Sequence, residues 1–534
     1  MPPDPTVPRR RPGLLGGPRL ADGAVVLALA GLVAILAAAG RVPTGDGPHL
    51  AALTMAVADQ ARGGDPWGAI GTFVTRVAPQ PPVGYLPGVL ATLLVGNRWL
   101  AMLLPGAVAL GVCWDALRRL GNGGTPWGPA LVLAASPMVW LYTEQYGWDL
   151  LTAAAMLQAL SWLHLSDGLR DRSAAIRFGL WMGAGFLTKY TFGMYLWLPC
   201  LWEAIRIARG PDRARRLRVL GVAILAFGFV FVPWIVVNGS ELSWYLQRSV
   251  GAGALAAVDT TRVGAARFSL GSLALYPLAL KDALGWPGLA ALLAVGIAGS
   301  VPALARPAAD AGGRTGAGLA LLAALGGVGV LSCLEQSQDR YALPALAALA
   351  ALALPIGRLR WGQEVFGGVF VIQLIATLAT FWPGAPAGAE PRFDHGLATA
   401  AAMSWPRTRS YLPTHLDLDA WHVDAVLEGP ASATLPGSDA RVALVLPNDP
   451  RLPEPGIYLM RARQRGLLLD LRIFRPGDTT PPPEGWPSVD VRWVYATVRP
   501  GRDPSTEAWL AAQPRPRSEV FTLPGGATGG VYGP

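Results

Sequence analysis

Residues 178–205 read FGLWMGAGFLTKYTFGMYLWLPCLWEAI, an apolar run with one polar break near its middle. The break is the tetrapeptide Leu187-Thr188-Lys189-Tyr190. The run is long enough for two short membrane spans, and a charge at membrane depth is costly and often functional. We therefore predict two short helices that meet close to Lys189.

Apolar runs of the same kind extend on both sides of this stretch. A membrane span needs about 20 mostly apolar residues, and fewer where it is buried among other helices. We predict nine further spans, at residues 23–40, 98–114, 128–142, 149–165, 219–237, 284–301, 316–334, 341–356 and 366–382. The sequence thus predicts an all-α polytopic membrane protein with about 11 transmembrane helices.

The composition of the 534-residue chain favours the same class of protein. Hydrophobic residues make up 52% of the chain and charged residues 15%, whereas soluble domains contain about 25% charged residues. The mean hydropathy is +0.36. These values exclude a disordered protein, a fibrous protein and a simple cytosolic enzyme. Three cysteines exclude a disulfide scaffold, and Cys113, Cys200 and Cys333 fall in apolar runs, where we expect core residues.

The basic residues indicate the orientation of the spans. Residues 1–383 carry a net charge of +10 and residues 384–534 a net charge of −1. With the N-terminus in the cytoplasm, 19 of the 29 Lys and Arg residues in the first part fall on the cytoplasmic side. This bias agrees with the positive-inside rule, and eleven spans place the C-terminus outside. A nucleic-acid-binding protein would carry its basic residues on a soluble domain instead.

The chain divides into three predicted parts. Residues 1–22 form a cytoplasmic segment, and residues 23–383 form the transmembrane domain with long outer loops at 41–97 and 238–282. Residues 384–534 form a small periplasmic α/β domain, with strands at 440–446, 467–473 and 489–498 and helical turns at 416–426 and 505–512. The first outer loop contains an amphipathic stretch at 48–62 and a Pro-rich turn.

Ionisable residues gather on the outer face of this topology. They are Asp46, His49, Glu144, Asp149, Lys189, Arg262, Arg267, Glu335 and Arg340. Singly, Asp46 can be a solvated loop residue, Asp149 can cap a helix, and Lys189 can reach the membrane interface. Their shared face predicts one outward-facing polar site at the membrane boundary.

Acids close to bases at such a site suit transfer of a group from a lipid phosphate. Lys and Arg stabilise the negative charge that builds on a phosphate leaving group. A carboxylate can accept the proton of an acceptor hydroxyl. A body of many apolar helices can hold a polyprenyl chain, and a lipid-linked donor suits a compartment without nucleotide sugars.

Several short patterns in this region resemble the GT-C membrane glycosyltransferases, in particular family 39-like enzymes related to protein O-mannosyltransferases and aminoarabinose transferases. The patterns are Asp46 after the first span, Gln80-Pro81-Pro82-Val83-Gly84-Tyr85, Asp149 at the start of the fourth span, Leu187-Thr188-Lys189-Tyr190 and Arg340-Tyr341-Ala342-Leu343-Pro344. The resemblance covers residues 20–383. Each pattern is short, and their order and common side make the set specific.

The resemblance implies an inverting transfer of a sugar from a polyprenyl-phosphate donor to an acceptor hydroxyl at the periplasmic face of the bacterial inner membrane. It implies that Asp46 is the catalytic base and that Asp149 supports the site. It also implies that Lys189 and Arg340 contact the donor phosphate, with Tyr341 beside them. The acceptor would be a lipid, a glycan or a protein, and nucleic acid has no part. The sequence leaves a divalent metal open and requires none.

The chain departs from the family at two of these patterns. Many relatives carry two adjacent acids after the first span, whereas Gly47 follows Asp46 here. A His commonly precedes the Pro-Pro pair, whereas this chain has Gln80. Gln80 and Tyr85 therefore remain candidate site residues without an assigned role.

Two other classes of function remain open. A transporter or flippase of lipid-linked glycans would need a polar path through the bilayer, whereas the ionisable residues here lie at one face. A binding module formed by residues 384–534 could use the helices as an anchor, but eleven spans are many more than an anchor requires.

Overall fold

The computed structural model describes most of the helical part and pieces of the C-terminal part. The described residues are 29–37, 47–75, 81–96, 99–121, 127–250, 270–305, 315–332, 339–354 and 362–381, followed by 423, 427, 441–445, 455–464, 473–474, 491–498, 517–522 and 528–532. Residues 29–37, inside the first predicted span, are helical.

The first outer loop is mostly helical. α2 (Gly47–Arg62) matches the predicted amphipathic stretch, and α3 (Pro66–Thr75) follows after a turn. The Pro-rich turn forms the short 3-10 helix η1 (Pro82–Gly84), which leads into α4 (Leu86–Val95). α4 has 10 residues, too few to cross a bilayer, as its sequence predicted.

The next helices form the first half of the body. α5 (Trp99–Leu120) is longer than the span predicted at 98–114. The span predicted at 128–142 consists of two helices, α6 (Trp127–Ala134) and α7 (Pro137–Glu144), because Pro137 begins a new helix. α8 (Asp149–Leu165) has the predicted bounds.

The opening stretch of sequence folds as two helices with a break at Lys189. α9 (Arg172–Phe186) is followed by η2 (Tyr190–Phe192) and α10 (Gly193–Arg209). α11 (Arg213–Val250) bends at Asn238, where its backbone leaves helical geometry. The segment predicted as an outer loop at 238–282 therefore begins as helix.

The remaining body helices begin at residue 270, inside the segment predicted as a loop at 238–282. α12 (Leu270–Ala305) is broken at Gly285, where φ is 71°. After it come α13 (Thr315–Ser332), η4 (Asp339–Ala342), α14 (Leu343–Leu352) and α15 (Gly362–Phe381).

Two buried polar residues of α15 compensate for helix breaks. Gln373 donates to the carbonyl of Ala283, beside the break in α12, at 2.8 Å. Thr377 donates to the carbonyl of Ala135, between α6 and α7, at 2.7 Å. A carbonyl at a helix break lacks its usual helical partner. In an apolar surrounding no water replaces that partner, so a side chain has to donate the hydrogen bond.

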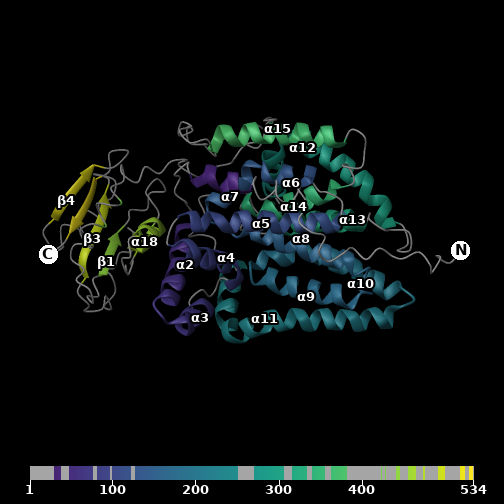
Figure 1. The fold of residues 1–534 in the computed structure, drawn as a ribbon, viewed down its shortest axis with the longest axis horizontal. Coiled ribbons are helices and arrows are strands. Elements are labelled where there is room, and N and C mark those ends of the chain that lie inside the picture. The colour runs from purple at the N-terminus through teal and green to yellow at the C-terminus, as the bar shows by residue number, and fades with distance from the viewer. Residues whose placement is uncertain are drawn as a thin grey trace.

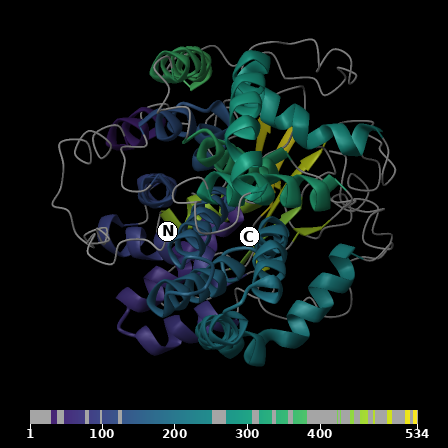
Figure 2. The same cartoon turned by 90° about the vertical axis from the view of Figure 1, so that its right-hand side faces the viewer.

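The body is built around α8 and α14, which are buried along their lengths. α8 packs against α5, α9, α13 and α14. Figure 1 shows these helices running along the long axis, with α11 and α15 on opposite sides. Figure 2 views the same bundle along that axis, so that many helices are seen end-on.

Among the described residues, two helices are long and apolar enough to cross a membrane, Trp99–Leu120 and Arg213–Ser243. Shorter apolar helices are Pro82–Val95, Gly316–Ser332, Arg340–Leu352 and Glu364–Leu378. On α11, Leu225, Phe229 and Val236 are 74%, 80% and 77% exposed. Large apolar side chains this exposed suit a helix that faces lipid. The number of spans stays a prediction.

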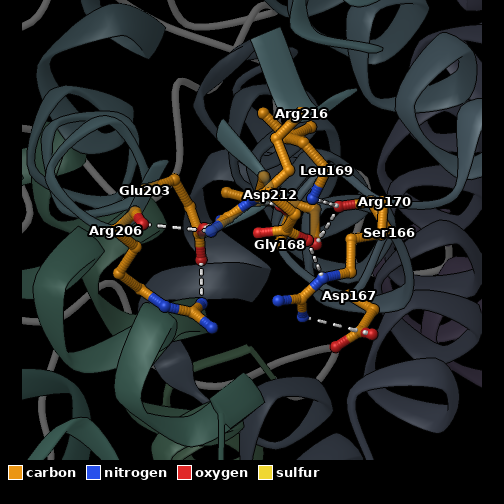
Figure 3. Close-up of polar contacts among 10 residues, drawn as sticks. Ser166, Asp167, Gly168, Leu169, Arg170, Glu203, Arg206, Asp212 and Arg216 are labelled. Atoms are coloured by element: carbon orange, nitrogen blue, oxygen red, sulfur yellow. Dashed lines mark hydrogen bonds and ion pairs between the residues drawn. The ribbon is translucent and has the colours of Figure 1, made fainter. Parts of the chain in front are cut away.

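An ion-paired network, shown in Figure 3, joins the turn after α8 to α10 and to the start of α11. The buried Arg216 donates to the carbonyl of Gly168 at 2.6 Å and lies 3.3 Å from the Glu203 carboxylate. Arg170 and Asp212 pair at 2.6 Å, and this hydrogen bond lowers the pKa of Asp212 below its ordinary value. We call these contacts the inner clasp.

The C-terminal part contains a five-stranded sheet in the order β2-β1-β3-β5-β4. Its strands are β1 (Arg441–Val445), β2 (Ile473–Phe474), β3 (Val491–Val498), β4 (Arg517–Thr522) and β5 (Thr528–Tyr532). β1 pairs in parallel with β2 and β3, whereas β5 is antiparallel to β3 and β4. The three predicted strands overlap β1, β2 and β3. The predicted helical turns lie almost entirely outside the described residues.

One helix connects this part to the body. α18 (Pro455–Gln464) packs against α2, and its Met460 joins a hydrophobic cluster with Leu50, Met55 and Trp148. Figure 1 shows the sheet beyond α18, at the end of the molecule where α2 lies. Whether residues 384–534 form an independent periplasmic domain stays a prediction.

Candidate functional site

Asp149 is the central residue of the candidate site. It opens α8, and its side chain is 2% exposed. A carboxylate in the first turn of a helix is favoured by the helix dipole. The preceding turn is tight, because Tyr146 has a φ of 53° and Gly147 follows it. The sequence thus fixes the carboxylate at a helix start.

Lys189 reaches this carboxylate from the break between α9 and α10. Its backbone is extended, with φ −163° and ψ 136°, so the α9 helix cannot continue through it. Its Nζ lies 2.6 Å from Asp149 Oδ1, and its side chain is 18% exposed. The polar break quoted from the sequence therefore carries a charged group to the start of α8.

η4 brings a second cation and a ring to the same place. Arg340 Nε lies 3.8 Å from Asp149 Oδ2, and its side chain is 20% exposed. Lys189 Nζ lies 4.4 Å from the ring centroid of Tyr341, and the Arg340 guanidinium lies 5.7 Å from the same centroid. Both distances are within the range of cation–π attraction.

The Pro-Pro turn packs directly behind this group. Val83 N–H donates to the carbonyl of Leu187 at 2.8 Å, which ties η1 to the break that carries Lys189. Tyr85 is buried, and its ring meets that of Trp148 edge-on at 4.4 Å. A Cβ on Gly84 would lie 2.6 Å from the Trp148 ring. Only glycine lets the turn approach Trp148 so closely.

α2 is tied to the same region by one hydrogen bond. Thr54 Oγ1 and Tyr146 Oη lie 2.9 Å apart, and both side chains are buried. His49, near the N-terminal end of α2, is exposed. The structure thus joins α2, which follows Asp46 in the sequence, to the turn before Asp149.

The remaining candidates fall into two groups. Glu144, at the end of α7, is buried, with 5% exposure. Asp46, Gln80, Arg262, Arg267 and Glu335 lie outside the described residues. Four predicted residues, Asp149, Lys189, Arg340 and Tyr341, are therefore brought into one cluster, which we call the outer cluster.

The outer cluster has one carboxylate and two cations, so its formal charge is +1. The carboxylate is buried, whereas each cation keeps about a fifth of its side chain exposed. In this arrangement the buried carboxylate orients Lys189 and Arg340, and the two cations can still donate hydrogen bonds to an anion. The described residues contain no group of three or more His, Cys, Asp or Glu side chains that could hold a metal ion.

Two residues of the site were not singled out in the sequence. Trp148 packs on the Pro-Pro turn, and its buried indole N–H has no hydrogen-bond partner among the residues that the structure describes. Tyr195 Oη donates to the backbone carbonyl of Tyr341. Aromatic residues in apolar runs resemble core residues, so only the adjacency of Trp148 to Asp149 could have indicated its place.

Two crystal structures of ArnT from Cupriavidus metallidurans match this chain in three dimensions. Each match covers 96% of this chain and 98% of that chain at 16% sequence identity. The TM-score is 0.58 for the apo state and 0.60 for the structure bound to undecaprenyl phosphate. No family model matches the sequence, and no curated protein matches it. The chain therefore has the fold of ArnT, as its resemblance to the GT-C enzymes predicted.

Proposed function

With the fold of ArnT as the premise, we propose that this protein is a membrane glycosyltransferase. It transfers a sugar from a polyprenyl-phosphate donor to an acceptor hydroxyl at the periplasmic face of the bacterial inner membrane. The observation that carries the proposal is the outer cluster, in which Asp149 holds Lys189 and Arg340 side by side. The lipid phosphate bound in one ArnT structure is the kind of ligand that such a pair suits.

The two cations act on the leaving group. When the bond between the sugar and the phosphate breaks, the phosphate oxygen takes the bonding electrons and gains negative charge. Lys189 and Arg340 stabilise that charge, and they need little reorganisation because Asp149 and the Tyr341 ring already orient them. Asp149 remains an ion-pair partner and takes no proton.

The acceptor needs a base on the opposite side of the sugar. We assign this role to Asp46, which accepts the proton of the acceptor hydroxyl while the hydroxyl oxygen attacks the anomeric carbon. A single displacement of this kind inverts the configuration at that carbon. The assignment rests on the sequence pattern after the first span, and on the link of α2 to the site through Thr54.

Undecaprenyl phosphate binding to the purified protein in detergent tests the phosphate role. We expect undecaprenyl phosphate to bind better than undecaprenol, its uncharged counterpart. Arg340→Ala should weaken phosphate binding about tenfold and leave undecaprenol binding unchanged, since it removes one charge-assisted contact. Arg172→Ala, at an exposed arginine of α9, is the matched control. Equal binding of the two lipids would contradict the proposal.

The same protein tests the base. In a transfer assay with a polyprenyl-phosphate sugar, Asp46→Asn should lose transfer and keep donor binding, because the base acts on the acceptor. Normal turnover in this variant would refute the role of Asp46. Movement of an intact lipid-linked glycan between leaflets without sugar transfer would favour a flippase instead.

A further inference from the structure

Tyr195 connects the helix that follows Lys189 to the element that carries Arg340. It lies in the first turn of α10, six residues after Lys189, and is fully buried. Its hydroxyl donates a hydrogen bond to the backbone carbonyl of Tyr341 in η4. This bond spans 146 positions of the chain and joins α10, the helix that follows the break at Lys189, to the element that carries Arg340.

A glycine on a third helix makes room for the Tyr195 ring. α13 packs against α10, and a Cβ on Gly327 would lie 2.0 Å from Tyr195 Cδ1 and 2.2 Å from Cε1. Real atoms do not approach so closely, so any larger residue at 327 must displace the ring. Gly329, on the same helix, would place a Cβ with nothing within 4 Å.

We infer that Tyr195 is a positioning residue for phosphate binding, seated by Gly327 and acting through the backbone of Tyr341. The inference rests on the proposed function. Its hydroxyl fixes η4 against α10, and so keeps Arg340 and the Tyr341 ring at their distances from Lys189. A phosphate that bridges two cations needs both in place, because binding otherwise has to order them first.

This inference can be tested by measuring, in detergent, how tightly a set of variants binds undecaprenyl phosphate and undecaprenol. Tyr195→Phe removes one oxygen and keeps the ring. We expect it to weaken undecaprenyl phosphate binding about fivefold, the value of one ordinary hydrogen bond, and to leave undecaprenol binding unchanged. A role in packing alone would affect both lipids equally, since they share the same chain.

Two glycine variants of α13 test whether Gly327 makes room for the Tyr195 ring. Gly327→Ala should reproduce the selective loss, because the new methyl group displaces the Tyr195 ring. Gly329→Ala should bind both lipids as the unmodified protein does. If Gly327→Ala weakens both lipids, Tyr195→Phe still decides the point, since that change adds no atom.

A double-mutant cycle provides the second readout. If Tyr195 acts through η4, Tyr195→Phe should cause a smaller loss of phosphate affinity in an Arg340→Ala background than in the unmodified protein, because only its effect on the Tyr341 ring remains. Additive losses, equal loss of both lipids, or unchanged phosphate binding in Tyr195→Phe would each overturn the inference and leave the proposed function standing. Lack of phosphate preference in the unmodified protein would instead overturn the proposed function, and this inference with it.

Discussion

Asp149 is a buried carboxylate whose closest cation is Lys189, at 2.6 Å. Removing one partner of a buried pair leaves the other charge uncompensated, which costs far more than the pair itself contributes. The Arg340 guanidinium lies farther away, at 3.8 Å, and cannot replace the lost contact without moving. The stability of the site therefore depends mainly on the Asp149–Lys189 pair.

This dependence predicts the behaviour of one single variant and one double variant. Lys189→Met should lower the free energy of unfolding by about 3 kcal/mol, because Asp149 then stays buried without its closest cation. The double variant Asp149→Asn/Lys189→Met should recover most of that loss, since no buried charge remains unpaired. Thermal unfolding in detergent measures both. If the double variant unfolds at least as easily as Lys189→Met, the two residues are not coupled as described.

At the residue scale the sequence predicted the charged members of the site and Tyr341, and it missed Trp148 and Tyr195. Asp149, Lys189 and Arg340 stand at the ends of apolar runs, where a topology alone places them on one face. Tyr195 and Trp148 carry no charge and belong to apolar surroundings. Their roles depend on a backbone carbonyl and on a glycine turn far away in the sequence, which no local pattern reveals.

At the scale of elements, the Pro-Pro turn η1 packs closely against the start of α8, where Gly84 contacts the Trp148 ring. We predict that Gly84→Ala lowers the free energy of unfolding by about 1–3 kcal/mol, because its methyl group overlaps the Trp148 ring. Gly71→Ala is the matched control, since a Cβ there meets nothing within 4 Å. Thermal unfolding of the two variants compares them, and equal stability would mean that the turn does not pack as described.

The inner clasp holds the opposite ends of α8, α10 and α11. Arg216→Ala should destabilise the protein by about 1–3 kcal/mol, because the carbonyl of Gly168 loses its donor while the buried Glu203 keeps Arg206 as an ion-pair partner at 2.6 Å. Its neighbour Arg215 is exposed, so Arg215→Ala should change stability by less than about 0.5 kcal/mol. Both variants should bind undecaprenyl phosphate normally. A selective loss of binding in Arg216→Ala would place the clasp in the lipid site.

The sequence predicted the bounds of α8 and the break at Lys189, and it missed the break between α6 and α7. α8 has the predicted bounds because a charged residue precedes its apolar run and a turn follows. The break between α6 and α7 was missed although Pro137 marks it, because the apolar residues on both sides form one continuous run. Thr377 satisfies the carbonyl of Ala135, more than two hundred positions away.

At the scale of the whole molecule, the arginine bias predicts which end faces the cytoplasm. The inner clasp lies at that end, and α2 and α3 lie at the other. In a variant without the native cysteines, Trp67→Cys should react with a membrane-impermeant maleimide in spheroplasts, whereas Pro211→Cys should react only after permeabilisation. Both positions are exposed. The reverse pattern would invert the topology and move the outer cluster to the cytoplasm.

The class of fold was predictable for the helical part and much less so for the C-terminal part. Long apolar runs and a charge bias determine a bundle whatever its detailed packing. β4, β5 and α18 were missed because their segments are short, and the sequence before and within β5 is rich in glycine. The docking of α18 on α2 buries Met460, a contact between distant segments that periodicity cannot show.

The central claim is that this protein removes a sugar from a polyprenyl phosphate and adds it to an acceptor outside the membrane. Mass spectrometry of the lipids and envelope glycans tests it most directly, in cells with the gene, without it, and complemented with Asp46→Asn. We expect both deficient strains to lack one sugar in a glycan and to accumulate the matching undecaprenyl-phosphate sugar. Unchanged glycans, or restoration of the missing sugar by Asp46→Asn, would contradict it.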